Sequence, residues 1–186
     1  MSPGAHLLAS WILADRFEPE QQGRRLVALV GVIPDLDGLG VVADVLDHGR
    51  TEYYATYHHL LGHNLLFGLL VSGLAALLAR RGRGRVFALA LLAFHFHLLF
   101  DLMGSRGADG YQWPIPYLVP LMPKVELAWR HQWLFNGWQN LVILGALLVW
   151  AFLLAARNRR SLIEVISPGL EREVFKAVNQ RWGVRA

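Results

Sequence analysis

Three long apolar segments constrain the fold of this chain most strongly. Residues 58–79, 86–103 and 138–156 contain histidines and a single aspartate as their only ionisable side chains. Apolar segments of about 20 residues match the thickness of a bilayer's hydrocarbon core. The chain of 186 residues is 54% hydrophobic and 17% charged, whereas soluble domains average about 45–50% and about 25%. We therefore expect an all-α integral-membrane bundle with about three full spans; the alternative is a soluble helical protein with a very apolar core.

Shorter elements flank these spans. Residues 5–15 and 25–33 predict two short N-terminal helices, the second ended by Pro34. The residues after 156 are charged and amphipathic, which predicts a surface helix. We expect a membrane-embedded domain over residues 1–156 and a basic cytoplasmic tail over residues 157–186.

The basic residues predict the orientation in the membrane. They gather in residues 16–25, 80–85 and 157–160, and short basic loops prefer the cytoplasm. Residues 104–137, rich in Trp and Tyr, then lie at the outer interface of a multi-pass inner-membrane protein. The first residues lack a basic n-region, so we expect no cleaved signal peptide. The net charge is +4. Because the basic residues follow span ends and form no continuous face, membrane lipid is the expected partner and nucleic acid is not; the oligomeric state stays open.

In this topology a set of imidazoles and carboxylates falls at the outer ends of the elements. Ionisable groups at membrane depth are costly and commonly functional. The chain has no cysteine, so a metal would need imidazole and carboxylate ligands, which suit zinc, manganese or iron. The candidates are His6, Asp35, Asp37, His58, His59, His63, His97 and Asp101.

Spacing separates some of these candidates. His97 and Asp101 are four residues apart and share a helix face. His95 lies about 160° from His97 around the helix, so we expect it to be hydrogen-bonded inside the bundle. His59 and His63 share a face if residue 59 is already helical; the alternative is a set of interfacial histidines.

Two aspartates lie in the turn after the second short helix. Asp35 and Asp37 can bind one metal or bridge two ions, or they form an ordinary Asx turn or helix cap.

The order of these motifs resembles the YdjM-like family of membrane-bound metal-dependent hydrolases. It comprises a histidine in the first helix, "PDLD", paired histidines opening a span, "HLLFD" and a Trp-Pro loop, within about residues 1–155. More loosely, it is similar to the zinc-dependent phospholipase C and nuclease group. His59 and Gly62-His63-Asn64 depart from the family's usual histidine-arginine and threonine-histidine-serine. The resemblance implies a metal site on His6, Asp35, Asp37, His58, His63, His97 and Asp101.

These observations predict an integral-membrane metal-dependent hydrolase. Seven ligand candidates exceed one tetrahedral site, which favours one or two divalent ions, zinc first. Asp37 is the expected general base. The position at the outer interface favours a phospholipid or other lipid-borne phosphoester as substrate. The alternatives are a membrane haem or electron-transfer protein and a metal-binding or transport protein that uses the same histidines.

Overall fold

The computed structural model describes residues 1–182, which form helices joined by loops and no β-strand. The expected all-α class is therefore confirmed. The last four residues of the predicted tail lie outside the described residues. The helices are α1 (Pro3–Phe17), α2 (Gln21–Val30), the 3-10 helix η1 (Ile33–Leu39), α3 (Gly40–Leu46), α4 (Tyr53–Tyr57), α5 (Leu65–Leu78), α6 (Arg83–Gly104), α7 (Trp138–Asn158), α8 (Ile163–Ile166) and α9 (Pro168–Trp182).

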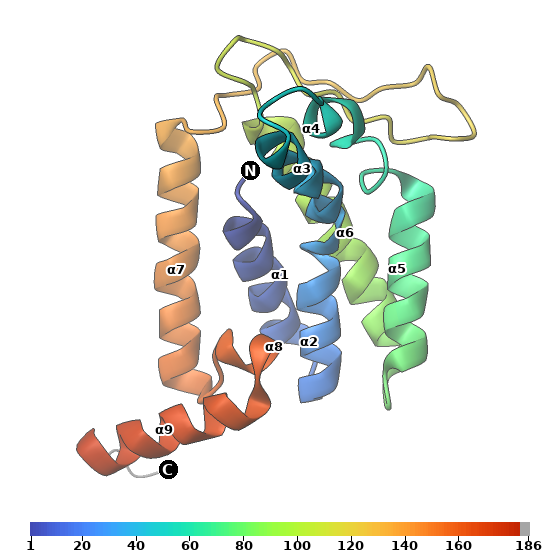
Figure 1. Ribbon diagram of the computed structural model, residues 1–186. Coiled ribbons are helices and arrows are strands. Elements are labelled where there is room, and N and C mark those ends of the chain that lie inside the picture. The colour runs from blue at the N-terminus through green and yellow to red at the C-terminus, as the bar shows by residue number, and fades with distance from the viewer. Residues whose placement is uncertain (183–186) are drawn as a thin grey trace.

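The helices form an upright bundle that is capped at both ends (Figure 1). The short helices α1 and α2 stand in the middle, with α7 on one side and α5 and α6 on the other. At one end lie η1, α3, α4 and the loop of residues 105–137. The last two helices, α8 and α9, lie at the opposite end. The two predicted short N-terminal helices and the predicted C-terminal surface helix are all present.

The expectation of about three full spans holds only in part. With 22 and 21 residues, α6 and α7 are long and apolar enough to cross a membrane. A third span exists if α2 and residues 33–46, which meet at an angle of 42°, count as one broken span. The predicted span over residues 58–79 is wrong, because α5 has only 14 residues and begins at Leu65.

Local backbone geometry explains why that helix starts late. His59 has a left-handed backbone with φ 68°, which a helix does not accommodate. A Cβ on Gly62 would lie 2.4 Å from the backbone oxygen of Pro34, so this glycine allows close contact with η1. The Oδ1 atom of Asn64 then accepts a hydrogen bond from the Phe67 N–H at 2.9 Å and caps α5. Residues 58–64 therefore form a folded loop.

Small side chains let the inner helices approach closely. The buried core combines α1, α2, α5 and α6 and contains Val27, Ala75, Ala90 and Phe94. A Cβ on Gly68 would lie 2.5 Å from the Phe94 ring, so α5 and α6 need that glycine to pack. Small residues at such contacts are typical of membrane helices.

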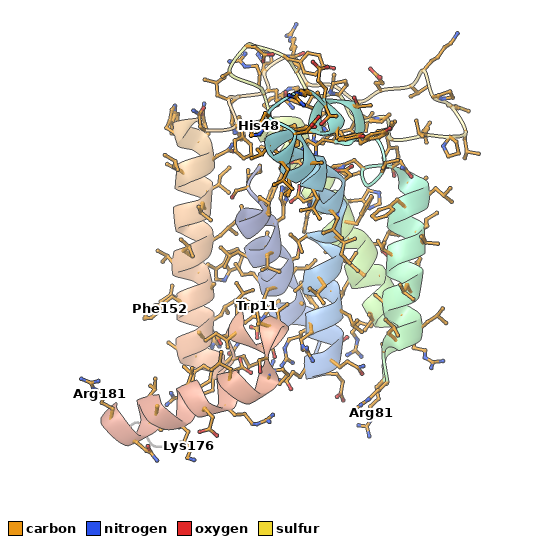
Figure 2. The ribbon with its side chains drawn as sticks, viewed as in Figure 1. Trp11, His48, Arg81, Phe152, Lys176 and Arg181 are labelled. Atoms are coloured by element: carbon orange, nitrogen blue, oxygen red, sulfur yellow. The ribbon has the colours of Figure 1, made fainter. Side chains whose placement is uncertain are left out.

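The outer faces of α5 and α7 are apolar and exposed. Phe152 on α7 is 72% exposed and points away from the bundle in Figure 2. A soluble protein rarely shows such a large apolar surface. These faces are suited to contact with lipid chains.

A buried ion pair attaches α8 to the bundle. Arg24 donates to both carboxylate oxygens of Glu164 at 2.8 and 2.7 Å, and the Trp11 indole donates to the same group at 2.9 Å. Figure 2 shows Arg81, Lys176 and Arg181 at this end of the molecule and His48 at the opposite end. These three basic residues therefore lie away from the histidine-bearing end.

Candidate metal centre

The centre is built around one face of α6. His97 and Asp101 are both buried, and the His97 Nε2 atom lies 3.0 Å from Asp101 Oδ2. The spacing of four residues places both side chains on the same face, as expected from the sequence. His95 lies elsewhere on the helix: its ring nitrogens lie 2.7 Å from the Leu91 carbonyl oxygen and 2.8 Å from the Tyr117 hydroxyl. His95 is hydrogen-bonded, as expected, but its partners are Leu91 on the same helix and Tyr117 in a loop, where we expected a neighbouring helix.

Three other elements bring ligands to this face. From α1, His6 Nε2 lies 3.1 Å from Asp101 Oδ1. From η1, Asp35 Oδ1 lies 3.7 Å from His97 Nε2. From the loop of residues 58–64, His63 Nε2 lies 3.4 Å from Asp101 Oδ2. Residues up to 95 positions apart in the chain thus share one buried site.

Hydrogen bonds determine which nitrogen of two imidazoles is free. The Gly31 carbonyl can only accept, so His97 Nδ1 carries a proton and donates it at 2.9 Å. In the same way, His63 Nδ1 donates to Asp37 Oδ2 at 3.0 Å. Both Nε2 atoms are therefore left to face the centre, only 3.1 Å apart. Anchored imidazoles of this kind are typical metal ligands.

The donor set fits a bound cation. Asp101 Oδ2 is buried beside both Nε2 atoms and has no hydrogen-bond donor among the described residues. Two nitrogen lone pairs and a carboxylate oxygen repel one another unless a proton or a metal ion lies between them. The Met1 amino group contacts the other oxygen, Oδ1, and Ser105 donates to that oxygen at 2.9 Å. The open coordination position is therefore at Oδ2.

The ligand atoms form two overlapping groups. In each group the atoms lie within 4.8 Å of one another. Asp101 belongs to both groups. The first is His6, Asp35, His97 and Asp101, and the second is His59, His63 and Asp101.

His59 is an unusual member of the second group. It is 2% exposed, and neither of its ring nitrogens has a hydrogen-bond partner among the described residues. Burial, with a smaller contribution from His63, holds its pKa well below the ordinary value. His59 is thus a neutral imidazole with an available lone pair.

Asp37 and His58 lie next to these groups and belong to neither. The two oxygens of Asp37 approach His58 Nδ1 at 2.9 Å and His63 Nδ1 at 3.0 Å. The Gly62 N–H donates to the same carboxylate at 2.9 Å. Asp37 therefore orients both histidines. This is the carboxylate-histidine arrangement commonly found behind metal ligands.

A cavity of about 310 Å³ connects the centre with the capping loops. Asp101 and Ser105 contribute to it from the end of α6. Tyr54 and His58 contribute from α4 and the residue after it, and Trp113 from the long outer loop. This cavity gives a small molecule or headgroup access to the carboxylate of Asp101.

Comparison with known proteins identifies the family. The family model described as YdjM inner membrane protein matches residues 1–168. The chain belongs to the YdjM inner membrane protein family. No curated protein and no solved structure matches it significantly.

In this YdjM family member, the sequence-derived candidates separate into two sets. Five of the seven predicted ligands lie in the ligand groups, while Asp37 and His58 lie behind them. His59 takes the place beside His63 that the resemblance assigned to His58. Helical spacing also pointed to His59, but through a helix that does not exist: the contact arises from the folded loop, where the two rings lie 4.3 Å apart.

The site has further contributors that the sequence did not predict, among them Gly31 and Arg106. The Gly31 carbonyl anchors His97, and Arg106 lines the cavity. A backbone acceptor leaves no mark on the sequence. Arg106 follows Asp101 by five residues, and this proximity was the available signal.

Proposed function

We propose that this protein is an integral-membrane, metal-dependent hydrolase that acts on a lipid-borne phosphoester. The observation that carries the proposal is the convergence of two anchored imidazoles, His63 and His97, on the unpaired oxygen of Asp101. Membership of the YdjM inner membrane protein family supports the membrane location.

The two ligand groups would hold one or two divalent ions, with zinc the best match to the donor set. A metal bound there supplies a water of lowered pKa and neutralises negative charge on a phosphoryl group. Because Asp101 belongs to both groups, it could contribute a ligand atom to an ion held by either group.

His58 is the residue best placed to move a proton. Its Nδ1 lies 2.9 Å from Asp37, so the carboxylate holds the Nδ1–H tautomer and leaves Nε2 as a base. His58 lines the cavity, whereas both oxygens of Asp37 already accept hydrogen bonds. From the sequence we expected Asp37 to be the general base. We now assign the proton transfer to His58, and Asp37 has the role of positioning the His58 ring.

An apolar cavity supports a lipid substrate. It has a volume of about 510 Å³ and lies between α1, α6 and α7. Phe100 lines this cavity, and its ring centroid lies 6.1 Å from that of His6 in the candidate centre. An acyl chain held between these helices would place its headgroup near the metal ligands.

The geometry disfavours a haem held between two of these histidines. Bis-histidine axial ligation places the two imidazoles on opposite faces of a macrocycle. Here the Nε2 atoms of His63 and His97 are 3.1 Å apart, and the His6 and His97 rings stack at 3.8 Å. The experiment below also distinguishes hydrolysis from metal transport.

Asp101→Asn tests the proposal, with His95→Gln on the same helix as its matched control. Asn keeps the shape of Asp but lacks its charge, so we expect Asp101→Asn to lose the metal and at least about 100-fold in hydrolysis of lipid phosphoesters. His95→Gln should retain both. Elemental analysis and a phosphoester panel on detergent-purified protein give the two readouts. Full metal content and activity in a folded Asp101→Asn protein contradicts the proposal. Metal uptake by vesicles without any hydrolysis favours transport.

A further inference from the structure

The cavity above the centre carries one cationic side chain that the assignment of metal ligands leaves unused. Among the described residues that line it, Arg106 is the only arginine or lysine. It shares this cavity with Asp101 and with His58. A guanidinium and a metal-binding carboxylate therefore face the same space of about 310 Å³.

The backbone of Arg106 is held in place from both sides. Its N–H donates to the Trp133 carbonyl at 3.1 Å, and its carbonyl accepts from the Phe135 N–H at 2.9 Å. These bonds form an isolated bridge between Arg106 and Leu134. Arg106 also follows the end of α6 by only two residues. The arginine is thus fixed relative to Asp101.

The side chain of Arg106 has no counter-charge of its own. None of the ion pairs among the described residues includes Arg106. Its buried Nε atom has no acceptor within the described part of the chain. A buried donor without a partner costs free energy, so an anion that enters the cavity would satisfy it.

We infer that Arg106 is the anion-binding residue of this site and takes a phosphoryl oxyanion beside the metal. This inference rests on the proposed function and names the group that its substrate presents. A guanidinium binds two phosphoryl oxygens at once, while the metal neutralises a third.

Binding of phosphate to the zinc-loaded protein tests the inference without relying on turnover. Wild type, Arg106→Gln, Arg106→Lys and the control Arg130→Gln are titrated calorimetrically with inorganic phosphate. Arg130 is an exposed arginine of the same outer loop and does not line the cavity. A second arm uses micelles with a short-chain phosphatidic acid or with phosphatidylcholine, and so distinguishes free phosphate from a lipid headgroup.

We expect Arg106→Gln to weaken binding of the phosphate probe by about 10- to 100-fold at unchanged zinc content. Arg106→Lys should lie between this variant and wild type, because lysine keeps the charge without the bidentate geometry. Arg130→Gln should match wild type. The inference is overturned if Arg106→Gln binds phosphate as tightly as wild type does. It is also overturned if wild type binds neither probe. If wild type binds phosphate through Arg106 but holds no metal, the anion-binding role of Arg106 stands, whereas the metal beside it and the hydrolase proposal are overturned.

Discussion

At the scale of single residues, hydrogen bonds decide which atoms face the centre. The Gly31 carbonyl accepts a hydrogen bond from His97 Nδ1, and the Asp37 carboxylate accepts one from His63 Nδ1. Both histidines therefore present Nε2 to Asp101. His58 and His59 are neighbours in sequence and differ completely in surroundings. His58 pairs with Asp37 beside the cavity, whereas His59 is buried without a partner among the described residues.

The variants His58→Asn and His59→Asn separate these two roles. We expect His59→Asn to weaken zinc binding by at least about 10-fold. Loss of a residue that only hydrogen-bonds to a metal ligand already has an effect of that size. His58→Asn should keep its metal and lose about 10²- to 10⁴-fold in rate, the usual contribution of a general base. Elemental analysis and steady-state rates measure both. The opposite pattern would return His58 to the ligand set.

Metal affinity should depend on pH through His63. Burial alone lowers the pKa of His63, but the neighbouring carboxylates of Asp101 and Asp37 prevail and raise it to about 9 in the metal-free protein. A metal ligand must be unprotonated, so zinc affinity should rise about tenfold per pH unit below pH 9 and level off above it.

The stability of the metal-free protein should change with pH in the opposite direction to zinc affinity. The folded-state pKa of His63 lies above its ordinary value of 6.5. Protonated His63 therefore stabilises the metal-free protein fully below pH 6.5, and this contribution disappears as pH rises through about 9. Competitive chelator titrations and thermal unfolding over this range measure both effects. A zinc affinity independent of pH would contradict the assignment of His63 as a ligand.

At the scale of elements, the loop of residues 58–64 supplies two candidate ligands, as many as the long helix α6. It replaces the first turns of the predicted span and carries both His59 and His63. Its shape depends on the close contact of Gly62 with Pro34 in η1. Since η1 also carries Asp35 and Asp37, this contact holds two parts of the site together.

Gly62→Ala should therefore damage the site from outside the ligand set. A Cβ there would lie 2.4 Å from the backbone oxygen of Pro34, and we expect a loss of about 1–3 kcal/mol in stability together with weaker zinc binding. Gly73→Ala in α5 is the matched control, because nothing lies within 4 Å of its added Cβ. That substitution should be neutral or stabilising by up to about 1 kcal/mol. Thermal unfolding and zinc content compare the two variants; equal behaviour would argue against the loop's role.

At the scale of the whole molecule, the three basic clusters that predicted the orientation lie at the opposite end from the candidate centre. Arg16 at the end of α1 and the loops that bear Arg81 and Arg160 lie at one end, where Arg81 pairs with Glu20 at 3.6 Å and Arg160 with Asp15 at 3.6 Å. The centre and its cavity lie at the other end, under α3, α4 and the outer loop. Because short basic loops prefer the cytoplasm, we expect the centre to face the extracytoplasmic side.

Single cysteines test this orientation directly, because the chain contains none. Lys124→Cys lies in the exposed outer loop and Arg81→Cys in the exposed basic loop. We expect a membrane-impermeant maleimide to label Lys124→Cys on cells with a permeabilised outer barrier, and to label Arg81→Cys only after lysis. Labelling in the reverse order would place the centre in the cytoplasm.

Sequence alone determined the helical class, the two short N-terminal helices, the candidate spans α6 and α7 and most of the candidate ligand residues. These features follow from local causes. Long apolar segments must satisfy their backbone within a helix when they lie in lipid, and a spacing of four residues puts His97 and Asp101 on one face wherever that helix packs.

Only the tertiary structure decided the rest. The late start of α5, the choice between His58 and His59, the anchoring of His97 by Gly31 and the place of Arg106 all depend on contacts between segments distant in the chain. Glycine contacts and backbone acceptors carry no periodic signal, because they depend on what packs against them. Most candidate ligands could thus be named from nearby sequence alone. Their roles depended on which residues the fold places next to each ring nitrogen and carboxylate oxygen.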